Sequence, residues 1–281
     1  MNIHDLQPVK AIPVRGIDCG AIPLFLIAGP CVIETPDIMR RTAERLCQIQ
    51  NRLQLPIIYK SSFQKDNRSA GDFYRGPGLD EGLRILQDIR AEFDLPVLSD
   101  VHSISQVKPA GEVLDVIQIP AYLCMQTDLT EEVAKTGKVI NFKHGQFLAP
   151  ENMDKPVKKA EAQGNSQILL TERGVTFGYN DLVVDPRSFY IMREIGYPVI
   201  FDITHSVRRY GIPSADPKGG NREYLPVLGR AGMAAGVDGL FIEVHPNPPA
   251  ALCDASSQMY LDDLEVFLVP LLAINRIVKG I

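Results

Sequence analysis

The chain has 281 residues, of which 45% are hydrophobic and 22% are charged, a composition typical of a globular protein with a large core. Its formal net charge is −5 at pH 7, and no run of Lys or Arg is long enough to follow a phosphate backbone. Binding to nucleic acid or to an anionic membrane is therefore disfavoured. An anionic substrate would have to be held by a few placed cations.

The N-terminus and the cysteines favour a cytoplasmic protein. The segment from Met1 to Lys10 lacks the apolar core of a signal peptide, and no uncharged stretch approaches the ~18 residues that a membrane span needs. The five cysteines are an odd number without a disulfide-like spacing, which indicates reduced thiols. We expect small-molecule substrates, with no nucleic acid and no membrane among the partners.

Eight short apolar segments recur along the chain with turn signals between them. They are continuous apolar runs without alternation, as expected for parallel strands that are covered on both faces. The expected strands are Leu24–Ala28, Ile57–Tyr59, Val97–Ser99, Val116–Ile119, Val139–Phe142, Gln167–Leu170, Val199–Asp202 and Gly239–Ile242.

Helical patterns fill most of the gaps between these strands. The first helix is expected to begin at Thr35-Pro36-Asp37, where a hydroxyl caps the helix, proline suits the first turn and an acid faces the helix dipole. Residues 103–112 hold only a short helix, and Pro270 should kink or delay the last helix. The other expected helices are Leu79–Phe93, Asp128–Lys135, Met153–Ala162, Pro186–Ile195, Arg222–Ala235 and Leu261–Val278.

The alternation of eight strands with helices predicts the α/β class and a single (β/α)8 TIM barrel. Residues 1–22 precede the first strand and are expected to form a short segment that caps the barrel floor. Residues 23–281 are then the catalytic barrel domain. An open, doubly wound sheet is the alternative fold.

Every expected strand ends in polar, ionisable or thiol-bearing residues. In parallel barrels the active site lies at the carboxyl ends of the strands. Buried charges are costly unless they are paired or bound to a ligand, so their gathering at one rim predicts a ligand site, with rim ion pairs as the alternative. These groups include Cys31, Lys60, Ser62, Asp100, His102, Gln118, Lys143, His144, Glu172, Arg173, Asp202, His205, Glu243 and His245.

One group of these residues suits a metal ion. Closure of the barrel makes the last two strands neighbours of the first, which brings Cys31, His205 and Glu243 together, and Asp254 follows in the next loop. Thiolate, imidazole and carboxylate ligands fit a divalent ion such as Zn²⁺, Fe²⁺ or Mn²⁺. A cysteine taken singly is more often a small buried hydrophobe than a ligand. Alternative ligands in the same region are His245 and Cys253; we interpret Cys19, Cys47 and Cys124 as structural.

A second group is cationic and contains Lys60, Lys143 and Arg173. Three cations that face one cavity in an acidic protein indicate an anion with phosphate and carboxylate groups. A lysine inside a barrel can also form a Schiff base, so a lysine-dependent aldolase is an alternative reaction class. Further cations, which form either a second anion site or a solvated loop, are Lys65, Arg68 and Arg75.

Nine stretches carry most of these residues in a characteristic order. They are Ala28–Glu34 (AGPCVIE), Lys60–Phe63 (KSSF), Asn67–Ser69 (NRS), Arg75–Leu79 (RGPGL), Gln118–Leu129 (QIPAYLCMQTDL), Gly145–Pro150 (GQFLAP), Leu170–Ser188 (LTERGVTFGYNDLVVDPRS), Phe201–Val207 (FDITHSV) and Gly239–Pro246 (GLFIEVHP). Together they resemble the 3-deoxy-D-manno-octulosonate 8-phosphate synthases, also called 2-dehydro-3-deoxyphosphooctonate aldolases, in their metal-dependent branch. The resemblance runs from about Leu24 to the C-terminus.

The resemblance implies an enzyme of lipopolysaccharide sugar biosynthesis. It would condense phosphoenolpyruvate with D-arabinose 5-phosphate and water, giving 3-deoxy-D-manno-octulosonate 8-phosphate and phosphate. The implied phosphoenolpyruvate ligands are Lys60, Ser62, Gln118, Lys143 and Arg173, and the implied sugar-phosphate ligands are Asn67, Arg68 and Ser69. The implied catalytic residues are Lys60, Lys65, Asp100 and His205, and the implied metal ligands are Cys31, His205, Glu243 and Asp254. The resemblance also implies a homotetramer with an acceptor site completed across subunits.

Several positions depart from the usual pattern of these synthases. Ala70, Gly71 and Asp72 follow Asn-Arg-Ser where Ser and often His are usual, and Met125 stands where an arginine is usual. Most departures fall around the acceptor, so a sibling synthase that uses another phosphorylated aldose, such as erythrose 4-phosphate, is the alternative function. A non-catalytic sugar-phosphate sensor is the alternative outside enzymology. The sequence leaves the identity of the metal open.

Overall fold

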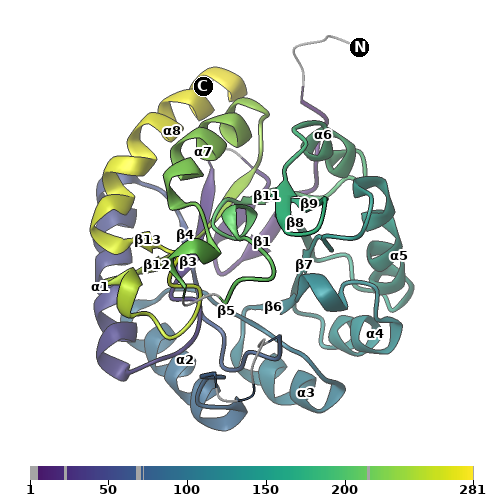
Figure 1. The fold of residues 1–281 in the computed structure, drawn as a ribbon. Helices are drawn as coiled ribbons and strands as arrows, with labels where there is room; N and C mark the ends of the chain where they lie inside the picture. The colour runs from purple at the N-terminus through teal and green to yellow at the C-terminus, as the bar shows by residue number, and fades with distance from the viewer. Residues whose placement is uncertain (1–5, 22–23, 68–70, 72, 214–215, 281) are drawn as a thin grey trace.

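The computed structural model describes residues 6–21, 24–67, 71, 73–213 and 216–280. Eight parallel strands lie at the centre of the molecule, and helices surround them (Figure 1). The strands are β3 (Phe25–Gly29), β4 (Ile57–Lys60), β5 (Val97–Asp100), β6 (Val116–Ile119), β7 (Val139–Lys143), β8 (Ile168–Glu172), β11 (Val199–Asp202) and β12 (Gly239–His245).

The pairing of the strands closes the sheet into a ring. Strand β11 pairs in parallel with both β8 and β12, and β12 pairs in parallel with β3. In this register Asp202 lies beside Phe241, and Gly29 lies beside Glu243. The predicted TIM barrel is thereby confirmed, and the open sheet is excluded.

The surrounding helices follow the predicted pattern with one exception. The first begins as expected, with Thr35 Oγ1 accepting a hydrogen bond from the backbone N–H of Ile38 at 3.3 Å. Pro270 lies inside the last helix and does not end it. The helices are α1 (Pro36–Leu53), α2 (Leu79–Phe93), α3 (Ile104–Val113), α4 (Thr127–Lys135), α5 (Asp154–Ala162), α6 (Arg187–Arg193), α7 (Leu225–Ala234) and α8 (Leu264–Lys279).

The exception is α3. The prediction of only a short helix over residues 103–112 was wrong, because α3 runs for 10 residues with Pro109 in its interior. Proline and glycine weaken a helix when considered alone. Here Gln106, Val107 and Ala110 are buried against the barrel. Tertiary packing therefore outweighs the local propensity.

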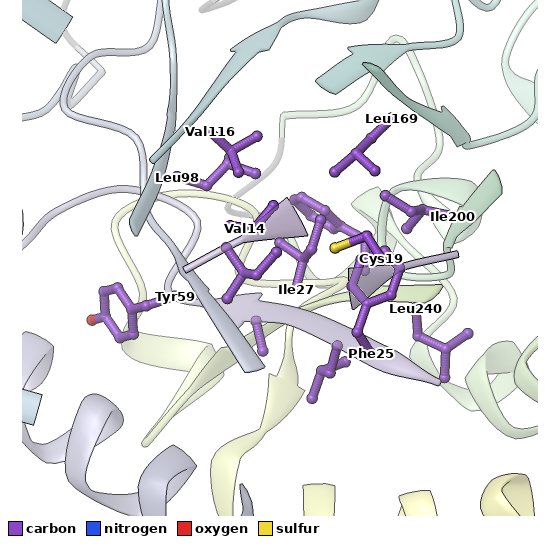
Figure 2. Close-up of a cluster of buried hydrophobic side chains, with 14 of the residues drawn as sticks. Val14, Cys19, Phe25, Ile27, Tyr59, Leu98, Val116, Leu169, Ile200 and Leu240 are labelled. Carbon is purple, nitrogen blue, oxygen red and sulfur yellow. The ribbon is translucent and has the colours of Figure 1, made fainter. Parts of the chain in front are cut away.

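The N-terminal hairpin packs into the barrel core. Strands β1 (Ile12–Val14) and β2 (Ile17–Cys19) pair antiparallel and bury Val14 and Cys19 in the main hydrophobic cluster. Figure 2 shows these two side chains among those of residues at the starts of the barrel strands, such as Phe25, Val116 and Leu240. The hairpin therefore lies at the amino end of the barrel, opposite the strand ends that carry polar residues.

Additional short elements decorate the barrel. A second hairpin, β9 (Val175–Phe177) with β10 (Asp181–Val183), follows β8, and β13 (Met259–Tyr260) extends the pairing of β12. The short 3-10 helices are η1 (Ala121–Leu123), η2 (Pro150–Met153), η3 (His205–Val207), η4 (Pro217–Gly219), η5 (Arg222–Tyr224), η6 (Pro248–Ala250) and η7 (Leu261–Asp263). Within the described ranges, no helix is both long enough and apolar enough to cross a bilayer.

Candidate active site

A cavity of about 280 Å³ opens at the carboxyl ends of the barrel strands. It is lined by side chains from several strand ends and from the loops that follow them. Among the site residues predicted from sequence, those that line it are Lys60, Lys65, Asn67, Asp100, Gln118, Lys143, Arg173 and His205. Arg68 and Ser69, predicted to bind the sugar phosphate, lie outside the described residues.

The barrel strands place these groups rigidly. Lys60, Asp100 and Lys143 are the last residues of β4, β5 and β7, so ladder hydrogen bonds fix their backbones. At the end of β3, a Cβ atom on Gly29 would overlap the carbonyl oxygen of Lys60. Only glycine permits this close approach, which lets the chain turn so that Cys31 reaches the same rim.

Lys60 is held by anionic and carbonyl groups deep in the barrel. Its side chain is 2% exposed. The Nζ atom donates to Glu243 Oε1 at 3.0 Å and to the carbonyl oxygen of Cys31 at 3.1 Å. The lysine therefore connects the cavity to the candidate metal ligands.

Lys143 sits against an aromatic ring and a carboxylate. Its Nζ atom pairs with Asp202 and lies 3.5 Å from the centre of the Phe241 ring. Burial lowers the pKa of Lys143 to about 8, although the charge of Asp202 acts in the opposite direction. This lysine can therefore lose its proton within a few pH units of neutrality.

Arg173 uses only part of its guanidinium for hydrogen bonds within the protein. Its guanidinium donates to the hydroxyl of Tyr210 and, at 3.0 Å, to the carbonyl oxygen of His205. Its Nε atom is buried and has no hydrogen-bond partner among the described residues. A buried donor without a partner costs about 1–3 kcal/mol, which an anionic ligand in the cavity would recover.

A hydrogen-bonded chain contributes Lys65, Asp100 and His102 to the cavity wall. Lys65 Nζ donates to Ser62 Oγ at 2.8 Å, and Ser62 in turn donates to Asp100. His102 Nε2 lies 3.1 Å from the other oxygen of Asp100. Burial would raise the pKa of Asp100, but Lys65 and His102 hold it well below its usual value. Ser62, the middle member of this chain, is fully buried and does not line the cavity.

The predicted metal ligands form two overlapping groups. The ligand atoms of His205, Glu243 and Asp254 all lie within 4.8 Å of one another, and so do those of Cys31, Cys253 and Asp254. His205 Nε2 is 3.6 Å from Glu243 Oε1 and 3.5 Å from Asp254 Oδ2. Asp254 therefore connects the imidazole side of the site to the thiol side.

These residues fit a divalent cation. Glu243 Oε2 is buried and has no hydrogen-bond partner in the described part of the chain. His205 Nδ1 contacts Asp202 Oδ2 at 2.7 Å, which leaves Nε2 facing the carboxylates, an arrangement common for metal-bound histidines. Burial would lower the pKa of His205, but Asp202 and Glu243 outweigh it and raise that pKa. A cation would compete with the proton at Nε2.

Other expected rim residues serve the fold. His144 Nδ1 lies 2.9 Å from Glu172 Oε2. The other oxygen of Glu172 accepts from the backbone N–H groups of Arg173 and Gly174. Neither side chain lines the cavity. His245, the alternative metal ligand, belongs to neither ligand group and lies 3.6 Å from Glu34.

Sequence reasoning missed several residues of the cavity wall, Gln146 and Tyr210 among them. Gln146 Nε2 donates to the Tyr210 hydroxyl at 2.7 Å, and both residues line the cavity. Both lie on loops beyond the strand ends, where no periodic pattern indicates the direction of a side chain.

The closed barrel, the cation-lined cavity at its strand ends and the adjacent ligand set define an anion-binding barrel enzyme. Residues 13–279 match the profile of the DAHP synthetase I family. Three relatives are each named 2-dehydro-3-deoxyphosphooctonate aldolase. That of Geotalea daltonii is 54% identical over 96% of this chain and 100% of its own length. Those of Pelobacter propionicus and Geobacter sulfurreducens are 55% and 54% identical over 96% and 92% of this chain, and over 99% and 95% of their own lengths.

The chain therefore belongs to the DAHP synthetase I family and, within it, to the 2-dehydro-3-deoxyphosphooctonate aldolases. This finding confirms the family resemblance drawn from the sequence motifs.

Proposed function

We propose that this chain condenses phosphoenolpyruvate with D-arabinose 5-phosphate and water. The products are 3-deoxy-D-manno-octulosonate 8-phosphate and inorganic phosphate. The observation that carries the proposal is the convergence of Lys60, Lys143 and Arg173 on one cavity in a protein of net charge −5. The near full-length similarity to aldolases of this name favours arabinose 5-phosphate over erythrose 4-phosphate as acceptor.

Phosphoenolpyruvate occupies the cationic side of the cavity in this proposal. Arg173 and Lys143 bind its phosphate and carboxylate, because a planar fork and a point charge together match two anionic groups. Gln118 Oε1 already accepts a hydrogen bond from Asn141 Nδ2 at 2.9 Å. The side-chain N–H groups of Gln118 are therefore left to donate to phosphoenolpyruvate. Lys60 lines the same cavity and completes the proposed site for phosphoenolpyruvate, and Ser62 is proposed to support it from outside the cavity lining, through its hydrogen bonds with Lys65 and Asp100.

The bond changes follow from the two substrates. Carbon 3 of phosphoenolpyruvate forms a bond to the aldehyde carbon of the sugar, and the aldehyde oxygen takes up a proton. Lys60 is the proposed donor of that proton, with Lys65 and Asp100 lining the reacting centre. Water then adds its oxygen to carbon 2, and the bond between carbon 2 and the phosphate oxygen breaks. His205 is the proposed contact for the aldehyde or for this water.

The acceptor phosphate is assigned to the loop after β4. Asn67 lines the cavity, whereas Arg68, Ser69, Ala70 and Asp72 lie outside the described residues. Gly71 is exposed and is not among the residues that line the cavity.

The fourth departure from the family pattern, Met125, contributes a backbone contact. Its carbonyl oxygen accepts from Lys159 Nζ at 2.8 Å, and its side chain does not line the cavity.

Cys31, His205, Glu243 and Asp254 would hold a divalent ion, Zn²⁺, Fe²⁺ or Mn²⁺. Such an ion supplies Lewis acidity and lowers the pKa of water at the site. The buried, unpartnered Glu243 Oε2 is the observation that supports this assignment. The residues around it, Lys60 above all, keep the carboxylate oriented.

Three broader assignments accompany the reaction. Residues 1–22 are proposed to cap the amino end of the barrel, with residues 23–281 as the catalytic domain; the buried Val14 and Cys19 support this. A homotetramer with an acceptor site shared between subunits is proposed, and sedimentation analysis tests it. A cytoplasmic location is supported by the five cysteines, all of them in the described part and all free thiols.

The experiment is a phosphate-release assay with phosphoenolpyruvate and a panel of phosphorylated aldoses. We expect arabinose 5-phosphate to give the highest kcat/KM, and unphosphorylated arabinose to react poorly. A clear preference for erythrose 4-phosphate, or no reaction with any pentose phosphate, would overturn the acceptor. Borohydride trapping of substrate on Lys60 or Lys143 would instead show a Schiff-base aldolase.

A further inference from the structure

Two thiols, and not one, lie beside the carboxylates of the candidate metal site. The Sγ atoms of Cys31 and Cys253 are 3.0 Å apart, and their side chains are 1% and 0% exposed. Both are free thiols. With a carboxylate oxygen of Asp254 they form a group of three ligand atoms within 4.8 Å of one another. A sulfur-rich half-site is therefore built into the wall of the barrel.

A buried amide holds the two cysteines in place. Gln258 is 0% exposed, and its Oε1 accepts from the backbone N–H of Cys31 at 3.2 Å. Its Nε2 donates to the carbonyl oxygen of Cys253 at 2.7 Å. The Gln258 side chain thus connects the loop after β3 to the loop after β12. Its amide oxygen holds the backbone of Cys31 and its amide nitrogen holds the backbone of Cys253, so the two thiols are kept side by side.

The backbone beside Cys253 adopts an unusual conformation. Asp254 has a φ angle of 49°, which places a non-glycine residue in the left-handed region at an energetic cost. With this turn, the side chains of two consecutive residues, Cys253 and Asp254, reach the same ligand group.

Fixed cations surround the group and can offset the charge of a second thiolate. Lys60 Nζ lies 3.0 Å from Glu243 Oε1, and an Arg208 guanidinium nitrogen lies 3.3 Å from Asp254 Oδ1. A dication with two thiolates and two carboxylates carries excess negative charge, which is costly to bury without such neighbours. Lys60 and Arg208 supply the positive charge that offsets this cost.

We propose that Cys253 is a second thiolate ligand of the metal ion, beside Cys31, and that Asp254 joins this pair to His205 and Glu243. The proposal rests on the metal site assigned under the proposed function. Because thiolates select softer ions over Mn²⁺, the second sulfur tunes the site toward Zn²⁺. Cys253 is thereby a residue that determines metal selectivity.

X-ray absorption of the zinc-loaded protein counts the sulfurs directly. Full-length protein is stripped with a chelator and reloaded with one equivalent of Zn²⁺, without substrate. We expect two sulfurs at ~2.3 Å in the wild type and one in Cys253→Ser and in Cys31→Ser. Cys47→Ser, which changes a partly buried thiol on α1, should keep two. A single sulfur in the wild type, or a Cys253→Ser spectrum equal to that of the wild type, overturns the proposal.

Metal affinities give a second, independent readout. In Cys253→Ser, Zn²⁺ binding should weaken at least ~10-fold, as even outer-shell changes at metal sites do, while Mn²⁺ binding changes much less. Equal losses for both ions overturn the selectivity role, and a matched melting temperature confirms that the variant is folded. Turnover on the same samples separates the two proposals. Two sulfurs without product formation would refute the proposed reaction alone, and one sulfur with product formation would refute only the second ligand.

Discussion

Buried charges lie at both ends of the barrel, but their partners differ. At the amino end, Asp238 pairs with Arg193, accepts from the backbone N–H of Val199 at 2.9 Å, and accepts from Lys279 at 2.9 Å. At the carboxyl end, Glu243 Oε2 and Arg173 Nε are buried and have no hydrogen-bond partner within the described ranges.

The difference shows what each set of charges is for. A buried ion whose hydrogen bonds are all made by the protein belongs to the fold, and removing one partner destabilises the folded state. A buried ion with an unused donor or acceptor carries a free-energy cost that a ligand can remove. Variants at the amino end should therefore change stability, and variants at the carboxyl end should change binding.

Loss of the metal should have the largest effect at the carboxyl end. Stripping with a strong chelator, or Cys31→Ser, should abolish phosphate release, because the remaining ligands bind a divalent ion far more weakly. Elemental analysis and the phosphate assay are run on the same sample. Full turnover in a sample without detectable metal would contradict the metal-dependent assignment.

Asp238→Asn should have the largest effect on the fold. It leaves the Arg193 charge buried without its counter-ion, and breaking such a pair typically costs about 3–5 kcal/mol in the free energy of unfolding. Urea denaturation measures this loss, and phosphoenolpyruvate affinity should not change. Asp88→Asn is the matched control, because its ion pair with Arg84 is exposed and contributes little. Equal stability of the two variants would refute the contrast between the two ends.

Arg173→Ala tests the same contrast from the carboxyl end. It removes a forked donor that lysine cannot replace, so phosphoenolpyruvate binding should weaken by at least ~2 kcal/mol, about thirtyfold. Calorimetric titration measures the affinity, and Arg173→Lys should give an intermediate value. Unchanged affinity in the alanine variant would mean that Arg173 serves only the fold, through its hydrogen bonds to Tyr210 and to the carbonyl oxygen of His205.

A smaller effect is expected from pH. As pH rises through about 8, Lys143 loses its proton, and kcat/KM for phosphoenolpyruvate should fall. In Lys143→Arg the side chain stays charged, so the plot of kcat/KM against pH should not show this fall. Between the folded value of about 8 and the ordinary value of 10.5, the unfolded chain binds the extra proton, so the Lys143 contribution to stability increases with pH. If kcat/KM depends on pH in the same way in the wild type and in Lys143→Arg, Lys143 is excluded as the titrating group.

The barrel and most of its rim could be predicted because their signals are local. Continuous apolar runs located all eight strands, and Thr35 with Pro36 located the start of α1. Since strand ends share one rim, the positions of Lys60, Lys143 and Arg173 at strand ends predict that they line one cavity, as they do.

The remaining features depend on tertiary packing. Pro109 argues against α3 locally, but buried contacts decide the outcome. Tyr210 and Gln258 lie on loops, whose side-chain directions have no period to read. A pattern also cannot show that His144 turns toward Glu172 and away from the cavity.

The most direct test follows a labelled oxygen through one reaction. Phosphoenolpyruvate carrying ¹⁸O between carbon 2 and phosphorus is incubated with arabinose 5-phosphate and the enzyme, and the products are analysed by mass spectrometry. The proposed reaction gives an unlabelled eight-carbon ketose phosphate, and all of the ¹⁸O leaves with inorganic phosphate. Absence of the eight-carbon product, or retention of the label on its carbon 2, would contradict the proposed reaction.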